Sequence, residues 1–196
     1  MHVLVVTAHP RKDSLTQTVA KKVCDGLLES GCTVELADLY AENFDPRLNI
    51  QDEPDWEDVE KEYSDEVKKE VARIERSDAL IMIFPVWWWG MPAMLKGWID
   101  RVWGYGFAYG EGNALSVQKI ISIGVSASSE SDEDSQAFFE SLKKQMVEGI
   151  CHYCGVKDST FVLLSNSLDG EERAEEIFAQ AHQIGVQCID NLINRK

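Results

Sequence analysis

Three segments of this sequence carry side chains suited to ligand binding. The first, TAHPRKDSLT (residues 7–16), offers the hydroxyls of Ser14 and Thr16 beside two cations, Arg11 and Lys12, and runs into a helical pattern. A helix N-terminus with free backbone amides favours an anion such as phosphate. The segment contains neither G-x-G-x-x-G nor G-x-x-x-x-G-K-[ST], which argues against a dinucleotide-binding Rossmann loop and a P-loop. A capped helix without a ligand is the alternative interpretation.

The second segment, PVWWWGMP (85–92), has three consecutive tryptophans. Neighbouring residues point in different directions, so these indoles cannot all enter one core. We expect at least one of them to face a cleft or a partner surface. Such rings can line a planar aromatic ligand, and their N–H groups need acceptors. Alternatively they fill a dimer interface, and both hold if the site lies at that interface. The third segment is GVSASSE (124–130).

Two other motifs have simpler interpretations. CHYC (151–154) has the spacing of a redox or zinc motif, but no second cysteine pair completes a structural zinc site. It also lies at the end of an expected helix, so we interpret Cys151 and Cys154 as packing residues and predict no metal site. GYGFAYGEG (104–112) follows a helix and is typical of a pocket loop. We find no convincing catalytic triad.

The elements that position these segments alternate regularly. Short apolar runs predict strands at 2–8, 32–40, 78–85, 118–125 and 156–164. Helical spacing predicts helices from Leu15, capped by Ser14 and Gly31, and at 54–76, 91–103, 132–151 and 171–194. Strands that are apolar on both faces predict a single α/β domain over 1–196, with a five-stranded parallel sheet and helices on both faces. Ligands bind such sheets at the carboxyl ends of the strands, where all three segments begin.

Composition excludes several classes of partner. The 196 residues suit one globular domain, and a formal net charge of -15 repels nucleic acid and acidic membranes. The apolar run 79–95 is interrupted by Pro85, Gly90 and Pro92, so we interpret it as a buried strand and loop with no membrane insertion. Five cysteines, an odd number, and a start without a signal-peptide pattern indicate a reducing, cytoplasmic compartment.

Longer stretches resemble a known family. FPVWWWGMPAMLKGWIDRVWGYGFAYG (84–110) closely resembles the signature of the NAD(P)H:quinone oxidoreductases. These flavodoxin-like enzymes include DT-diaphorase, modulators of drug activity and potassium-efflux ancillary reductases. TAHPRKDSLT resembles their phosphate loop, DLYAENFDPRL (38–48) the segment after their second strand, and HYCG (152–155) the end of their fourth main helix. These matches occur in the same order over most of the chain.

The resemblance implies a flavodoxin-like fold and a flavin that carries the chemistry, so no catalytic side chain is assigned. It favours FAD, with FMN as the alternative, and implies NADH or NADPH as donor and a quinone-like acceptor. The implied flavin contacts are His9, Ser14, Leu15 and Thr16 at the phosphates and ribityl chain, Pro85, Val86, Trp87, Trp88 and Trp89 along the isoalloxazine, and Gly124, Val125, Ser126 and Ala127 at its pyrimidine end. The family is homodimeric, with each site built from two chains, and Phe107 and Tyr109 would line the neighbouring subunit's acceptor pocket.

The sequence departs from the family at two points. Ser126 and Ala127 stand where members often have a Gly-Gly pair, and 128–139 lacks the Tyr and His that relatives of DT-diaphorase place near the flavin. This argues against a charge relay through such a pair. The missing Tyr and His leave open a flavin-binding regulatory subunit of a potassium-efflux system. The acidic charge leaves open a one-electron carrier of the flavodoxin type, although the phosphate loop lacks the Thr/Ser-Gly pattern of true flavodoxins.

Overall fold

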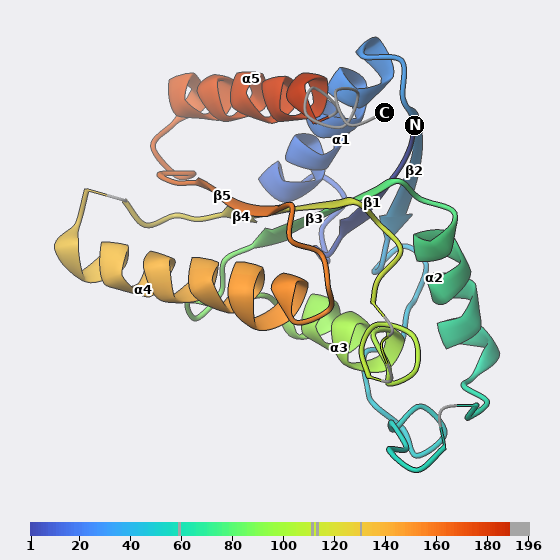
Figure 1. Cartoon of the computed structure of the whole chain (residues 1–196). Coiled ribbons are helices and arrows are strands. Elements are labelled where there is room, and N and C mark those ends of the chain that lie inside the picture. Colours follow the sequence, from blue (N-terminus) through green and yellow to red (C-terminus); the bar gives the residue numbers. More distant parts are fainter. Residues whose placement is uncertain (59, 111, 113, 130, 189–196) are drawn as a thin grey trace.

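A five-stranded parallel sheet forms the centre of the molecule (Figure 1). The computed structural model describes residues 1–58, 60–110, 112, 114–129 and 131–188. The strands are β1 (His2–Thr7), β2 (Thr33–Asp38), β3 (Ala79–Pro85), β4 (Lys119–Val125) and β5 (Ser159–Leu164), in the spatial order β2-β1-β3-β4-β5. The helices are α1 (Leu15–Glu29), α2 (Asp65–Glu75), α3 (Ala93–Val102), α4 (Glu133–Lys144), η1 (Gln145–His152) and α5 (Glu171–Gln187). The predicted α/β, flavodoxin-like architecture is confirmed.

Helices cover both faces of the sheet because its central strands are apolar on both sides. Along β1, Val3 and Val5 pack with α1 and α5, whereas Leu4 and Val6 pack with the helices of the other face. Figure 1 shows α1 and α5 above the sheet and α3 and α4 below it. Every residue of β3 and of β4 is buried. The expectation that all strands are apolar on both faces was wrong for the two edge strands, β2 and β5. Both are partly exposed, and Leu36 of β2 is 41% exposed.

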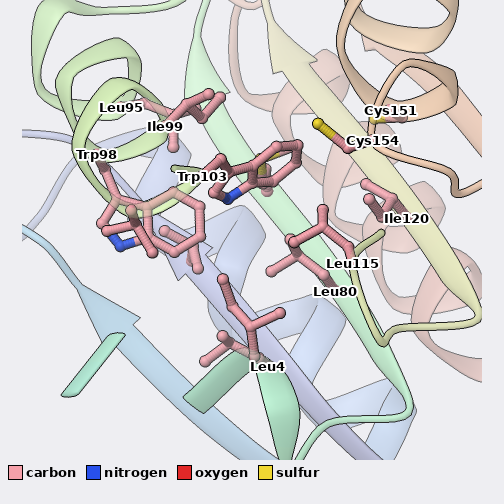
Figure 2. Close-up of a cluster of buried hydrophobic side chains, with 14 of the residues drawn as sticks. Leu4, Leu80, Leu95, Trp98, Ile99, Trp103, Leu115, Ile120, Cys151 and Cys154 are labelled. Carbon is pink, nitrogen blue, oxygen red and sulfur yellow. The ribbon is translucent and has the colours of Figure 1, made fainter. Parts of the chain in front are cut away.

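The core between α3, η1 and the sheet contains the two cysteines of CHYC. Figure 2 shows Cys151 and Cys154 among Trp103, Leu115 and Ile120. Burial raises the pKa of the Cys151 thiol to about 12 and that of Cys154 to about 11. Thiols that stay protonated are poor nucleophiles and poor metal ligands. The interpretation of these residues as packing cysteines agrees with this environment.

The predicted helix over 54–76 begins only at Asp65. Ser64 caps α2, its hydroxyl accepting a hydrogen bond from the Val67 amide at 3.3 Å, and two acidic residues follow in the first turn. The buried Asp52 carboxylate also accepts from the Ser64 amide at 2.9 Å. This long-range contact fixes the start of α2. The described residues before it, 53–58 and 60–63, form an irregular excursion, so the sparse apolar spacing there was misleading.

Two other helices differ from expectation in detail. The helix expected over 132–151 is α4 up to Lys144 and then widens into the π-helix η1, a change that residue spacing does not reveal. The C-terminal helix, expected over 171–194, is described as far as Gln187, and its predicted last part lies outside the described residues. At α1 the prediction was accurate: Ser14 is the N-cap, and Gly31 follows the helix with φ 79°. Within the described residues, we find no helix with the length and apolar character needed to cross a membrane.

Candidate functional site

The three segments identified in the sequence meet at the carboxyl edge of the sheet. The Val86 amide donates to the Val125 carbonyl at 2.8 Å, which joins the loops after β3 and β4. The His9 ring lies 5.7 Å from the Trp87 ring, which joins the loops after β1 and β3. The strand order changes direction between β1 and β3, since the chain passes from β1 to β2 on one side and then crosses to β3 on the other. A crevice at this position is the usual ligand site of such sheets.

The first loop presents an anion-binding helix end. The Ser14 hydroxyl accepts from the Gln17 amide at 3.2 Å, while the geometry of α1 leaves the Leu15 and Thr16 amides without an intrahelical acceptor. Gln17 also donates to the Asp38 carboxylate at 2.9 Å, which fixes α1 against the end of β2. The amides and the positive end of the helix dipole can hold a phosphate there.

His9 stands between this helix end and the tryptophan loop. The side chain is buried, and its Nδ1 accepts a hydrogen bond from the Arg11 amide at 3.1 Å. Burial, and secondarily the positive charge of Arg11, lower the pKa of His9. The imidazole is therefore neutral at pH 7, with its proton on Nε2. It can donate one hydrogen bond to a ligand without placing a charge in the site.

The second loop contains a strained tight turn. The amide and carbonyl of Trp87 pair with those of Gly90 at 3.0 Å in both directions. Between them, Trp88 and Trp89 have φ values of 51° and 56°, the left-handed region that bulky residues rarely adopt. Both central residues of a type I′ turn have this conformation, which asparagine and glycine usually supply. Each residue in this conformation costs about 1–3 kcal/mol, and such strain is characteristic of functional sites.

The three consecutive indoles occupy three different environments, as expected. Trp88 is 99% exposed, and Trp87 is 42% exposed. Trp89 lies against α4, stacked on Phe138 at 4.8 Å between ring centroids and edge-on to Phe139 at 5.1 Å. One ring thus holds the turn in place, and another is free to contact a ligand or a second chain.

A hollow separates the second and third loops. Its volume is about 230 Å³, and it is lined by Val86, Trp88, Trp89, Ser126 and Ser128. The Ser126 hydroxyl accepts from the Ser128 amide at 3.1 Å, so the third loop is folded on itself beside the hollow.

The remaining expected flavin contacts fall into two groups. Pro85, Gly124 and Val125 are buried at the ends of β3 and β4, so they can offer a ligand only backbone atoms. Ala127 is exposed beyond the strand.

Phe107 and Tyr109 are not brought to this hollow. They lie in the loop that leads from α3 to β4. At the end of this loop, the Gln118 amide donates a hydrogen bond to the carbonyl of Asp78, the residue just before β3. That loop therefore lies at the amino edge of the sheet, opposite the three binding loops. Within one chain these two residues cannot line the same cavity as the tryptophans.

Tyr109 belongs instead to a group of rings that we call the aromatic wall: Trp56, Tyr105, Tyr109 and Tyr153. Ring centroids lie 5.2 Å apart for Trp56 and Tyr105, 5.8 Å for Trp56 and Tyr109, and 5.5 Å for Tyr109 and Tyr153. Three of these residues line a groove of about 280 Å³ between α3 and η1. Burial, and then the neighbouring Tyr153, raise the pKa of Tyr109, so its phenol stays protonated and can donate a hydrogen bond. Sequence reasoning did not find Trp56 or Tyr153, because only the fold brings these distant aromatic residues together.

Comparison with known proteins identifies the family. The family model described as flavodoxin-like fold matches residues 1–186. The chain belongs to this family. It is 37% identical over 172 residues to the uncharacterised NAD(P)H oxidoreductase YcaK of Escherichia coli, covering 87% of each chain. It is 29% identical over 178 residues to the ribosyldihydronicotinamide dehydrogenase [quinone] of Mus musculus, covering 79% of this chain and 77% of that protein.

Solved structures agree with this family membership. The NAD(P)H:quinone oxidoreductase from Methanothermobacter marburgensis superposes with a TM-score of 0.86 at 32% identity, over 96% of both chains. The resemblance seen in the sequence is thereby confirmed.

This flavodoxin-like protein has its own arrangement in the stretch that departs from the quinone reductase pattern. In 128–139, the aromatic residues are Phe138 and Phe139 of α4, which pack on Trp89. They pack against the tryptophan turn on its α4 side and carry no titratable group. Any proton needed in this site must come from a different source, such as the His9 Nε2–H, a phenol or solvent.

Proposed function

We propose that this protein is a flavin-dependent oxidoreductase that uses NADH or NADPH to reduce quinones or similar electron-poor acceptors. The observation that carries the proposal is the meeting of three loops at the sheet's switch point, with an anion-binding helix end on one side and the strained tryptophan turn on the other. The names of its relatives, an NAD(P)H oxidoreductase and two quinone reductases, support the same activity.

The residues of the site fit a flavin. The Leu15 and Thr16 amides, with the hydroxyls of Ser14 and Thr16, would hold its phosphate. The backbone of 85–89 and 124–127 would lie along the tricyclic ring. The turn uses the amides of Trp87 and Gly90 and does not engage those of Trp88 and Trp89, which can donate to ring heteroatoms.

When bound, the flavin supplies the hydride-accepting and electron-transferring chemistry. The protein's part is to orient the ring, exclude water and offer fixed backbone dipoles. The strained turn fits this role, since its two left-handed residues fix the direction of their amides before a ligand arrives.

We propose FAD as the natural flavin, with FMN as the alternative, on the strength of the family resemblance. Mass spectrometry of the cofactor released from purified protein decides between them. The five cysteines are free thiols, which supports a reducing, cytoplasmic setting.

We further propose a homodimer in which each site is completed by the other chain. Phe107 and Tyr109 lie at the opposite edge of the sheet from the binding loops, so they can contact a bound flavin's substrate only from a second molecule. Trp88, almost fully exposed beside the hollow, offers a surface that such a neighbour would cover.

Turnover tests the proposal. Protein loaded with FAD or FMN should oxidise NADH or NADPH in the presence of a simple quinone, and a protein that binds neither flavin would refute the assignment. Flavin binding without turnover would instead favour a regulatory subunit, an alternative supported by the absence of the Tyr and His in 128–139. Reduction in two separate one-electron steps would favour a flavodoxin-type carrier.

A further inference from the structure

We propose that Trp56 determines which acceptors this protein reduces, and that the buried ion pair of Asp52 and Arg101 is the positioning element that holds Trp56 in place. This inference rests on the proposed function, in which Tyr109, a member of the aromatic wall, contacts the acceptor at the flavin of a second chain. Three features of the described residues support it: a clamp, an excursion closed by the clamp, and an aromatic contact surface on that excursion.

The clamp is centred on Arg101 of α3, whose side chain is only 3% exposed. Its Nε and Nη2 donate to the Asp52 carboxylate at 3.2 and 2.7 Å, and its Nη1 donates to Glu66 at 2.6 Å. Nη1 also donates to the Asp45 carbonyl. A single guanidinium therefore binds Asp45 and Asp52, which precede α2, and Glu66 in the first turn of α2. Only arginine has donors arranged to do this, because lysine carries a single ammonium.

Asp52 closes the excursion that follows it. Its side chain is 0% exposed and also accepts from the Ser64 hydroxyl and the Asn49 side-chain amide, each at 3.0 Å. Residues 52 and 64 are thereby joined, and the described residues between them, 53–58 and 60–63, form a loop whose two ends are held together. A buried carboxylate with this many donors favours one conformation of the two loop ends, because any other conformation would leave charged groups unpaired.

Trp56 is carried by this loop and reaches the aromatic wall. Although it is 64% exposed, its ring contacts both Tyr105 and Tyr109. The hydroxyl of Tyr63, on the same loop, donates to the Tyr105 carbonyl at 3.0 Å. Tyr63 also packs closely against Gly104, where a Cβ would lie 2.8 Å from that hydroxyl oxygen. The clamped loop therefore supports the segment that presents Tyr109.

The position of Trp56 favours acceptors with fused rings. Its indole extends the apolar surface beyond Tyr109 along the groove of about 280 Å³. A single-ring acceptor stacked near Tyr109 gains little from this extension, whereas the second ring of a naphthoquinone-like acceptor would contact the indole. An aromatic contact of this kind changes an equilibrium by about three- to tenfold.

The test uses flavin-loaded protein and measures kcat/KM for three acceptors: 2-methyl-1,4-naphthoquinone, 1,4-benzoquinone and ferricyanide, an inorganic ion with no ring to stack. Trp56→Ala should lower the value for the naphthoquinone about three- to tenfold and leave the other two within about twofold. Trp56→Phe should recover part of the loss. The matched control is Ile50→Ala, a residue 87% exposed on the same segment, which should change none of the three.

The clamp is tested by Arg101→Lys, which keeps the positive charge and removes the planar set of guanidinium N–H donors. It should reproduce the naphthoquinone defect, and the double variant Arg101→Lys/Trp56→Ala should equal Trp56→Ala alone, because Arg101 acts through Trp56. If Arg101→Lys does not fold by circular dichroism, Asn49→Ala, which removes one exposed donor to Asp52, replaces it with the same expectation.

Equal losses for all three acceptors in Trp56→Ala, or no loss for any, would overturn the inference. Additive effects in the double variant would overturn its second half, the positioning role of the clamp. A wild-type protein that reduces no acceptor would contradict the proposed function instead, so the two failures are distinguishable.

Discussion

Replacement of Asp52 by asparagine removes one charge from the most buried ion pair of the described residues and leaves the shape of the side chain unchanged. Asp52 accepts from Arg101, Ser64 and Asn49. An asparagine must point an amide N–H₂ group toward at least one of these donors, and the guanidinium loses its buried counter-charge.

The expected loss of stability follows from the contacts that remain. Breaking a buried ion pair from one side typically costs about 3–5 kcal/mol. Arg101 keeps Glu66 and the Asp45 carbonyl, so we expect the lower end, about 3 kcal/mol. In a chain of this size that corresponds to a fall in Tm of roughly 6–12 °C. With a total stability of about 5–15 kcal/mol, the variant should still fold.

The pH dependence of this difference gives a second check. Burial acts to raise the pKa of Asp52, but the Ser64 amide and Arg101 outweigh it, so the pKa lies below its ordinary value. A carboxyl whose pKa is lowered by folding contributes stability above its unfolded pKa of about 3.9 and loses it as the pH falls toward its folded pKa. The difference in free energy of unfolding between the wild type and Asp52→Asn should therefore be fully present at pH 7 and should shrink below about pH 4.

Urea unfolding followed by circular dichroism, at pH 7 and at a series of acid values, measures both effects. Asp45→Asn is the matched control, because its exposed carboxylate pairs only with Arg47 among the described residues and its carbonyl, which binds Arg101, is retained. It should leave the unfolding midpoint unchanged. If Asp52→Asn matched the wild type at pH 7, the clamp would not be formed in solution and this reasoning would be refuted.

Three further predictions concern packing and reactivity. Trp89→Ala should lower the free energy of unfolding by about 1–3 kcal/mol, since it removes two aromatic contacts with α4; urea denaturation that showed no loss would contradict the stacked arrangement. Gly26→Ala should lower the stability measured by thermal melting by about 1–3 kcal/mol or more, because its Cβ would lie 2.2 Å from a backbone oxygen of α5. The control Gly149→Ala, whose Cβ would have open space, should be neutral or stabilising in the same measurement. Cys151 and Cys154 should react with iodoacetamide at pH 8 only after unfolding, as mass spectrometry can show; rapid labelling of the folded protein would mean that they are not buried as described.

Local sequence signals were enough to predict the architecture. The central strands are continuous apolar runs because helices cover both of their faces, and β3 and β4 were recognisable for that reason. Ser14 and Gly31 marked the ends of α1 because caps satisfy backbone groups locally. Since parallel strands end at one edge, the convergence of the three binding loops could also be inferred before the structure was known.

The features that escaped sequence reasoning depend on contacts between distant residues. Asp52 and Arg101 are 49 positions apart, and nothing near Asp52 in the sequence indicates burial. Asp52 also binds Ser64, the N-cap of α2, so the helix expected from residue 54 begins only at Asp65. Trp56, which precedes it, lies against tyrosines that follow α3. Likewise, Phe107 and Tyr109 were recognised by resemblance, but only the fold shows that they lie at the opposite edge from the tryptophan turn.

The most direct test of the central claim is an anaerobic titration of the protein with FAD and with FMN, followed by addition of NADPH or NADH and then of a quinone. We expect one bound flavin per chain, loss of its visible absorbance when the nicotinamide is added, and full recovery when the quinone follows. A protein that leaves both flavins free in solution would contradict it.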